Sequence, residues 1–129
     1  MDPTWRLTIG QDTRGGILVL SVGGRLGSES SGRLLEALAA ALRAGERQIL
    51  VDLQGVDYVS SAGIRALAAA AARVHAAGGR LVLCAVTEPV RIVLAMGGLL
   101  ADVPAEPTLD AGVGRLLSSP PTNLDAADR

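Results

Sequence analysis

Residues 49–86 read ILVDLQGVDYVSSAGIRALAAAAARVHAAGGRLVLCAV, and this stretch decides the fold. It opens with Ile49–Leu53, an apolar run holding a single carboxylate, which is typical of a strand covered on both faces. Helical spacing follows at Ile64, Leu67, Ala68, Ala71 and Val74, and Gly78-Gly79 stops it. A second apolar run, Leu81–Val86, comes next. Strand, helix and strand in this order predict two parallel strands joined by a right-handed crossover.

The segment before this unit predicts a hairpin and a helix. Leu7–Gln11 and Ile17–Val22 are the expected strands, and the Gly-rich segment 12–16 is their connection. We expect Gly23-Gly24 to break the second strand. Leucines at helical spacing then predict a helix over Ser31–Ala44, with Gly45 as its left-handed stop.

The segment after the unit predicts two more helices. Thr87 is a plausible cap for the first, with Pro89 in a turn that needs no donor, and Gly97-Gly98 ends it. A short strand over 101–103 and a weak helix over 108–117 complete the domain, and residues 118–129 are expected to be a disordered tail. The prediction is therefore one α/β domain, residues 1–117, with a mixed, mostly parallel sheet of roughly four to five strands, an N-terminal hairpin and about four helices.

Composition excludes several functions. The net charge is -1, and one Trp with one Tyr cannot build a base-stacking platform, so nucleic acid is not expected as a partner. All twelve basic residues are Arg, which excludes a Schiff-base or phosphate-loop lysine. One Cys and one His cannot form a structural zinc site, and we expect neither metal nor cofactor. Without a signal pattern or a long apolar span, we expect a cytoplasmic protein that does not insert into membranes.

Two serines stand where the central helix begins. Gln54-Gly55 predicts a tight turn after the strand, and Ser61 can accept hydrogen bonds from the free amides of the first helical turn, as an N-cap does. Gly63 keeps the surface low, so another molecule could approach the backbone. A simpler interpretation is that Ser60 and Ser61 are caps and nothing more.

The stretch Val51–Ile64 resembles the signature of STAS domains, specifically of bacterial anti-sigma factor antagonists. The resemblance covers nearly the whole chain in element order. It implies that Ser61 is the phosphorylated residue and that Ser60 stands where some members carry Asp. It also matches Asp52 to the acidic residue at the strand end, which we expect to support the switch. The implied partner-binding residues are Asp57, Ser60, Ser61, Gly63 and Arg65.

The resemblance also implies a function. An unphosphorylated antagonist binds an anti-sigma factor that is also a serine kinase, and this frees the sigma factor. The kinase phosphorylates Ser61, the complex dissociates, and a metal-dependent serine phosphatase resets the switch. The protein is then a substrate and not an enzyme. One departure is Gly27, which stands where the family often carries an acidic residue.

Two alternatives stay open for the function. The chain could be the soluble STAS subunit of a membrane lipid transporter, or a partner-switch regulator of another output such as secretion. Catalysis is disfavoured, because His75 lies fourteen positions after Ser61 on one predicted helix, about 20 Å away. Asp52 and Asp57 could suggest paired carboxylates, but Asp57 in a turn is better explained as solvated or capping. Cys84 fits a small apolar core residue.

Overall fold

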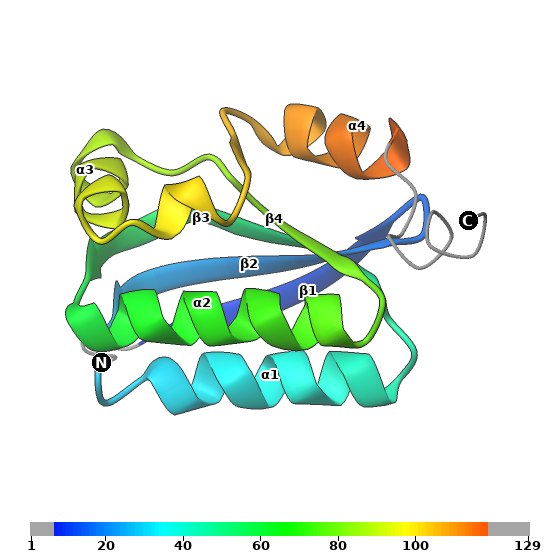
Figure 1. The fold of residues 1–129 in the computed structure, drawn as a ribbon, viewed down its shortest axis with the longest axis horizontal. Coiled ribbons are helices and arrows are strands. Elements are labelled where there is room, and N and C mark those ends of the chain that lie inside the picture. The colour runs from blue at the N-terminus through cyan, green and yellow to red at the C-terminus, as the bar shows by residue number, and fades with distance from the viewer. Residues whose placement is uncertain (1–6, 119–129) are drawn as a thin grey trace.

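The centre of the described part of the chain is a five-stranded sheet in the order β1-β2-β3-β4-β5 (Figure 1). The computed structural model describes residues 7–118. Its strands are β1 Thr8–Arg14, β2 Ile17–Leu26, β3 Gln48–Val59, β4 Arg80–Cys84 and β5 Ala105–Glu106. β1 is antiparallel to β2, and each later neighbour pairs in parallel. The predicted mixed, mostly parallel sheet led by a hairpin is confirmed.

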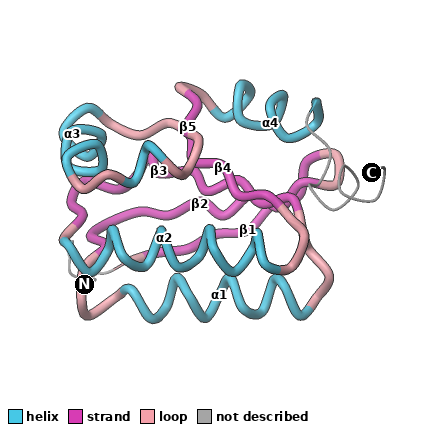
Figure 2. The backbone as a smooth tube through the Cα atoms, in the orientation of Figure 1, coloured by secondary structure: helices cyan, strands magenta, loops and turns pink. Residues whose placement is uncertain are grey.

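Within residues 7–118, four α-helices and one 3-10 helix surround the sheet (Figure 2). They are α1 Ser31–Arg43, α2 Ser61–Ala76, α3 Glu88–Met96, η1 Leu99–Ala101 and α4 Leu109–Ser118. α1 and α2 contact each other and lie along one side of the sheet, where the buried residues of α3 belong to the same core cluster, whereas α4 lies on the other side (Figure 1). The four predicted helices are confirmed, with ends that differ from the prediction by at most three residues.

The alternation of β2 divides the core between the two faces. Leu18, Leu20 and Val22 belong to the larger cluster, which includes the buried residues of α1 and α2. Ile17 and Val19 belong to a smaller cluster with Leu116 of α4. Successive side chains of a strand point to opposite faces, so a strand covered on both sides is apolar at every position. This explains the uninterrupted apolar runs in the sequence.

The hairpin turn is shorter than predicted. Gly15 and Gly16 form it alone, with φ of 58° and 85°, and the strand pairing continues to Arg14 opposite Ile17. Two residues with positive φ give the turn type whose twist matches that of the flanking strands, and glycine adopts them without strain. The expected connection over 12–16 is therefore wrong: residues 12–14 belong to β1.

Two predicted strand ends are also wrong. β2 continues past Gly23-Gly24 to Leu26, and β3 continues past Gln54-Gly55 to Val59. Gly23 and Gly55 are partners in the parallel register, and a Cβ added to Gly55 would lie 3.1 Å from Gly23 Cα. These glycines let two strands approach closely instead of ending them. The register shifts on both sides of this region by one extra residue of β3 each time.

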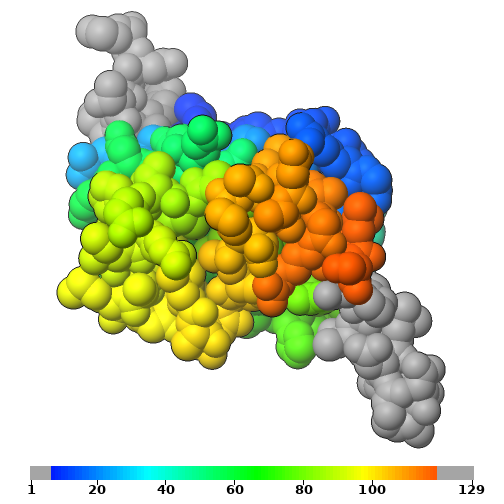
Figure 3. All heavy atoms as spheres, turned by 90° about the horizontal axis from the view of Figure 1, so that it is seen from above, coloured from blue at the N-terminus to red at the C-terminus, as the bar shows by residue number. Residues whose placement is uncertain are grey.

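The last strand lies later than predicted. Residues 101–103 do not form a strand, because Leu99–Ala101 is the 3-10 helix. The sheet resumes at β5, where the Leu83 amide donates to the Pro104 carbonyl at 2.9 Å and the Ala85 amide to Glu106 at 3.1 Å. Ser118 ends α4, and the remainder of the predicted tail lies outside the described residues. In Figure 3 most of the visible surface belongs to the second half of the chain, with atoms of the first half along one edge.

Candidate functional site

The site lies where β2 and β3 end, at the start of α2. The two strands are parallel, so their carboxyl ends meet at the same edge of the sheet, and Leu26 pairs with Val59 there. The Ser60 amide donates to the Leu26 carbonyl at 3.0 Å, which fixes the first turn of α2 against the end of β2. This edge is the usual location of functional loops in parallel sheets.

The structure gives the two serines different roles. Ser60 is extended (φ -95°, ψ 177°) and is the N-cap of α2, with its Oγ accepting a hydrogen bond from the Gly63 amide at 3.3 Å. The helix starts at Ser61, as predicted. The expectation that Ser61 is the cap is wrong by one residue, because the cap is the last non-helical residue.

Ser61 is exposed as the first residue of α2. No hydrogen bond from the rest of residues 7–118 engages its hydroxyl. Arg65, also exposed, is four residues further and therefore on the same side of the helix. Asp57 is exposed near the end of β3, inside the strand and not in the predicted turn. The structure thus brings Asp57, Ser60, Ser61 and Arg65 to one end of the sheet.

Gly63 does not lie at the surface. It is buried, and a Cβ added to it would collide with the Leu26 carbonyl and lie 2.9 Å from Val59 Cγ1. The prediction that Gly63 lowers the surface for a partner is therefore wrong. Its missing side chain lets α2 pack directly on the ends of β2 and β3.

Asp52 is not at a strand end. It lies within β3, opposite Ser21 and Cys84 of the neighbouring strands, and accepts a hydrogen bond from the Gln54 amide at 3.0 Å. Five residue steps of β2 separate its partner Ser21 from Leu26, so Asp52 is roughly 16 Å from the end of the sheet. This placement contradicts the expected position of Asp52, and it leaves that carboxylate without contact with Ser61.

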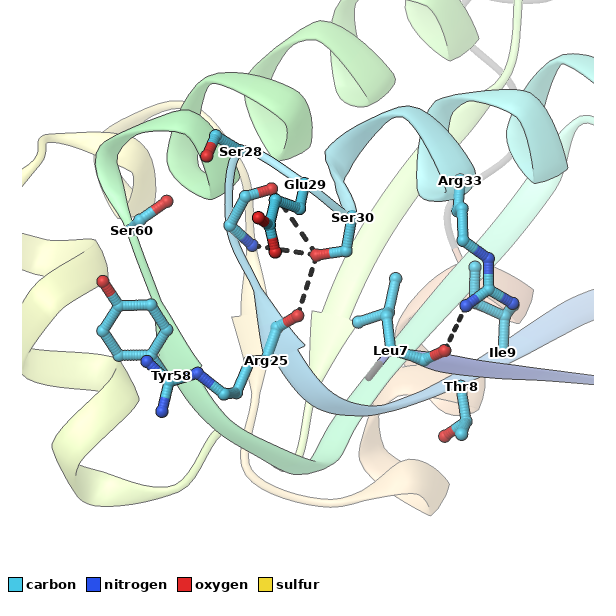
Figure 4. A pocket seen from close by; sticks show the side chains of 11 residues that line it. Leu7, Thr8, Ile9, Arg25, Ser28, Glu29, Ser30, Arg33, Tyr58 and Ser60 are labelled. Atoms are coloured by element: carbon cyan, nitrogen blue, oxygen red, sulfur yellow. Dashed lines mark hydrogen bonds between the residues drawn. The ribbon is translucent and has the colours of Figure 1, made fainter. Parts of the chain in front are cut away.

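A hollow of about 790 Å³ adjoins the cap (Figure 4). Its wall includes Arg25, the loop Gly27–Ser30, Tyr58 and Ser60. The Arg25 guanidinium lies over the Tyr58 ring, 4.1 Å from its centroid, as a cation–π pair. Sequence reasoning did not assign Arg25 or Tyr58 to the site. Their pairing depends on the register shifts between β2 and β3, for which the sequence carries no evident signal.

Serine hydroxyls hold the loop Gly27–Ser30 in place. Ser30 Oγ donates to the Arg25 carbonyl at 2.8 Å and accepts from the Gly27 amide at 3.0 Å. Ser31 Oγ donates to the Gly27 carbonyl at 2.6 Å. A Cβ on Gly27 would lie 3.4 Å from Ser60 Oγ, an ordinary contact. The position that is often acidic in the family therefore adjoins the cap, and it has room for a side chain.

Other reactive side chains lie away from the serines. His75 is on α2 with Ser61, and fourteen residues of helix keep them about 21 Å apart. Cys84 is fully buried, and desolvation, together with the nearby Asp52 carboxylate, raises its pKa to about 12. Between residues 7 and 118 there is no cluster of three His, Cys, Asp or Glu side chains that could hold a metal ion. No helix in that range is long and apolar enough to cross a membrane.

Comparison with known proteins assigns the family. The family model for the STAS domain matches residues 9–112. The chain belongs to the STAS domain family. It is 32% identical over 106 residues to BtrV of Bordetella bronchiseptica, a protein provisionally named an anti-sigma factor antagonist, and the match covers 82% of this chain and 91% of BtrV. The resemblance to the anti-sigma factor antagonist family is confirmed.

Solved STAS structures share the fold. An anti-sigma factor antagonist from Mycobacterium paratuberculosis superposes with a TM-score of 0.80 at 23% identity, covering 90% of this chain and 98% of that one. The anti-sigma factor antagonist SpoIIAA in its unphosphorylated form gives 0.73 at 16% identity, covering 88% and 99%. These similarities extend over almost all of each relative, so the fold is common to them.

Proposed function

We propose that this STAS protein is an anti-sigma factor antagonist controlled by phosphorylation of Ser61. In the unphosphorylated form it binds an anti-sigma factor that is also a serine kinase, in the cytoplasm, and thereby releases a sigma factor. Phosphorylation dissociates the complex, and a serine phosphatase restores the binding form. The similarity to BtrV over most of both chains supports the class.

The proposal rests on the different positions of the two serines at the start of α2. Ser60 caps the helix and is partly buried, whereas Ser61 is exposed and has no structural partner in the described part of the chain. A kinase needs a hydroxyl that it can reach without unfolding its substrate, and Ser61 meets that requirement. The simpler interpretation, that both serines are caps, does not account for Ser61.

The transfer itself uses groups of the kinase and one atom of this chain. Ser61 Oγ attacks the γ-phosphorus of ATP, and the bond from that phosphorus to the ADP oxygen breaks. ADP leaves, and the hydroxyl proton passes to a base of the kinase. The antagonist supplies only the nucleophile, so ATP and its metal ion are held by the partner.

Phosphate at Ser61 adds about -1.5 to -2 charges at pH 7. The positive end of the α2 dipole stabilises that charge, and Arg65 lies one turn away on the same side. The fold therefore tolerates the phosphate. A partner surface pressed against the same place would have to desolvate it, and a tenfold loss of affinity needs only about 1.4 kcal/mol.

Incubation with the kinase and ATP, followed by mass spectrometry, tests the proposal. We expect a single phosphate on Ser61 in the wild type and in Ser60→Ala, and none in Ser61→Ala. Phosphate on Ser60 would place the motif one residue earlier. No phosphate on either serine, together with a tight complex with a transporter ATPase, would favour the lipid-transport alternative.

A further inference from the structure

Exposed apolar side chains are concentrated at the end of the protein that carries Ser61. Among residues 7–118, the large hydrophobic side chains that solvent reaches are Tyr58 (42%), Ile92 (50%), Val93 (37%), Met96 (83%) and Leu117 (62%). Three belong to α3, and Tyr58 lies near the end of β3. Only Leu117 lies elsewhere: it contacts the β1–β2 turn, where a Cβ on Gly15 would be 4.0 Å from Leu117 Cδ2. That turn is at the start of β2, the opposite end from Leu26 and Ser60.

The three α3 residues form one continuous strip. Successive residues of an α-helix are rotated by about 100° around its axis. Val93 therefore lies about 40° from Gly97, Met96 about 60° beyond Val93, and Ile92 about 40° beyond Met96. Val90 and Leu94, which are buried, face the core. We name Ile92, Val93 and Met96 the α3 strip. It is the flank of α3 adjacent to Gly97.

Gly97 connects this flank to α2. A Cβ on Gly97 would lie 2.8 Å from Ile64 Cδ1, so the end of α3 packs directly against the first turn of α2. Ile64 is three residues after Ser61 and therefore one turn away on the same helix. The α3 strip thus begins beside the turn that carries the proposed phosphorylation site, and α3 also contacts β3, the strand that carries Tyr58.

The size of a protein interface brings the strip within reach of the partner. A standard interface covers about 800 Å² on each protein, which corresponds to a patch of about 16 Å radius. A kinase that contacts Ser61 therefore covers residues well beyond it. The polar rim of an interface contributes little affinity, whereas buried apolar anchors near its centre contribute most. Among residues 7–118, the exposed large apolar side chains at this end of the protein are those of the α3 strip and Tyr58.

We propose that the α3 strip, continued by Ile64, is the apolar part of the surface that holds the anti-sigma factor kinase, with Ser61 beside it and covered by the same partner. This inference rests on the proposed function, and it adds a separate source of affinity. The partner presents apolar side chains to α3 beside its catalytic cleft. Phosphorylation then controls an interface whose affinity comes mainly from α3.

The double variant Met96→Gln/Ile92→Gln tests the strip. Leu117→Gln is the matched control at the other end of the protein. Calorimetry measures binding of each unphosphorylated variant to the purified kinase that phosphorylates the wild type, without ATP. We expect the strip double variant to bind at least tenfold more weakly and Leu117→Gln to bind within twofold of the wild type. Met96 is the most exposed of these side chains, so Met96→Gln alone, expected to weaken binding severalfold, carries the test should the double variant melt early.

Four outcomes would overturn the inference. If the strip variants bind within twofold of the wild type, the inference is wrong, and the proposed function stays intact. Equal weakening by Leu117→Gln would show that the effect is not local. A strip variant that abolishes self-association in sedimentation, with kinase binding unchanged, would assign the strip to a second copy of this chain. A wild type that neither binds the kinase nor accepts phosphate would refute the proposed function as well.

Discussion

Replacing Ser60 with Ala should destabilise the protein, whereas the same change at Ser61 should not. Ser60 Oγ accepts the hydrogen bond of the Gly63 amide at 3.3 Å, and Gly63 is buried, so water cannot easily replace the lost acceptor. Loss of an N-cap costs about 0.5–2 kcal/mol. The length of this bond favours the lower half of the range, and the burial of its donor favours the upper half. We therefore expect a loss of about 1 kcal/mol.

Urea denaturation of the three proteins measures the difference. Ser60→Ala should lower the free energy of unfolding by about 1 kcal/mol with an unchanged m-value. In a thermal melt this corresponds to roughly 2–5 °C for a domain of this size. Ser61→Ala is a matched control, because it removes the same atom from an adjacent exposed position, and it should stay within about 0.5 kcal/mol of the wild type. A destabilised Ser61→Ala with an unaffected Ser60→Ala would refute the assignment of the cap.

Three further predictions concern packing, pH and the phosphorylated state. Gly63→Ala should cost at least about 1–3 kcal/mol in urea denaturation, because its Cβ would meet the Leu26 carbonyl; an unchanged midpoint would contradict that packing. The raised pKa of Cys84 means that only the unfolded thiol ionises between pH 9.0 and about 12, so stability should fall as pH rises through this window, by roughly 1.4 kcal/mol per unit. Cys84→Ala should show a shallower loss over the same range, and an equal slope would assign the effect to other groups. Phosphorylation of Ser61 should shift NMR resonances mainly over residues 56–68, and shifts throughout the sheet would contradict a local mechanism.

The sequence was sufficient for the fold because its strongest signals are periodic. The apolar runs of β3 and β4 and the helical spacing of α2 follow from burial on both faces of a parallel sheet. The strand ends were less predictable. Gly23 and Gly55 are turn-forming residues in isolation, but they face each other across two strands, and only the pairing reveals that they permit a close approach.

The site was predictable in part for the same reason. Ser60 and Ser61 precede the helical spacing, so the start of α2 could be placed to within two residues of Ser61, but the choice of cap depends on a backbone angle. Asp52 was misplaced because the end of β3 was misplaced. The pairing of Arg25 with Tyr58 and the contact of Ile64 with the end of α3 join segments that are distant in sequence.

Calorimetric titration of the kinase with the phosphorylated and unphosphorylated wild type tests the central claim most directly. Ser61→Ala, exposed to kinase and ATP in the same way, serves as the control that cannot be modified there. The account predicts that phosphorylated wild type binds at least tenfold more weakly than unphosphorylated protein, a loss of about 1.4 kcal/mol, and that Ser61→Ala keeps the full affinity after the same treatment. Equal binding by both forms of the wild type would contradict a switch at Ser61.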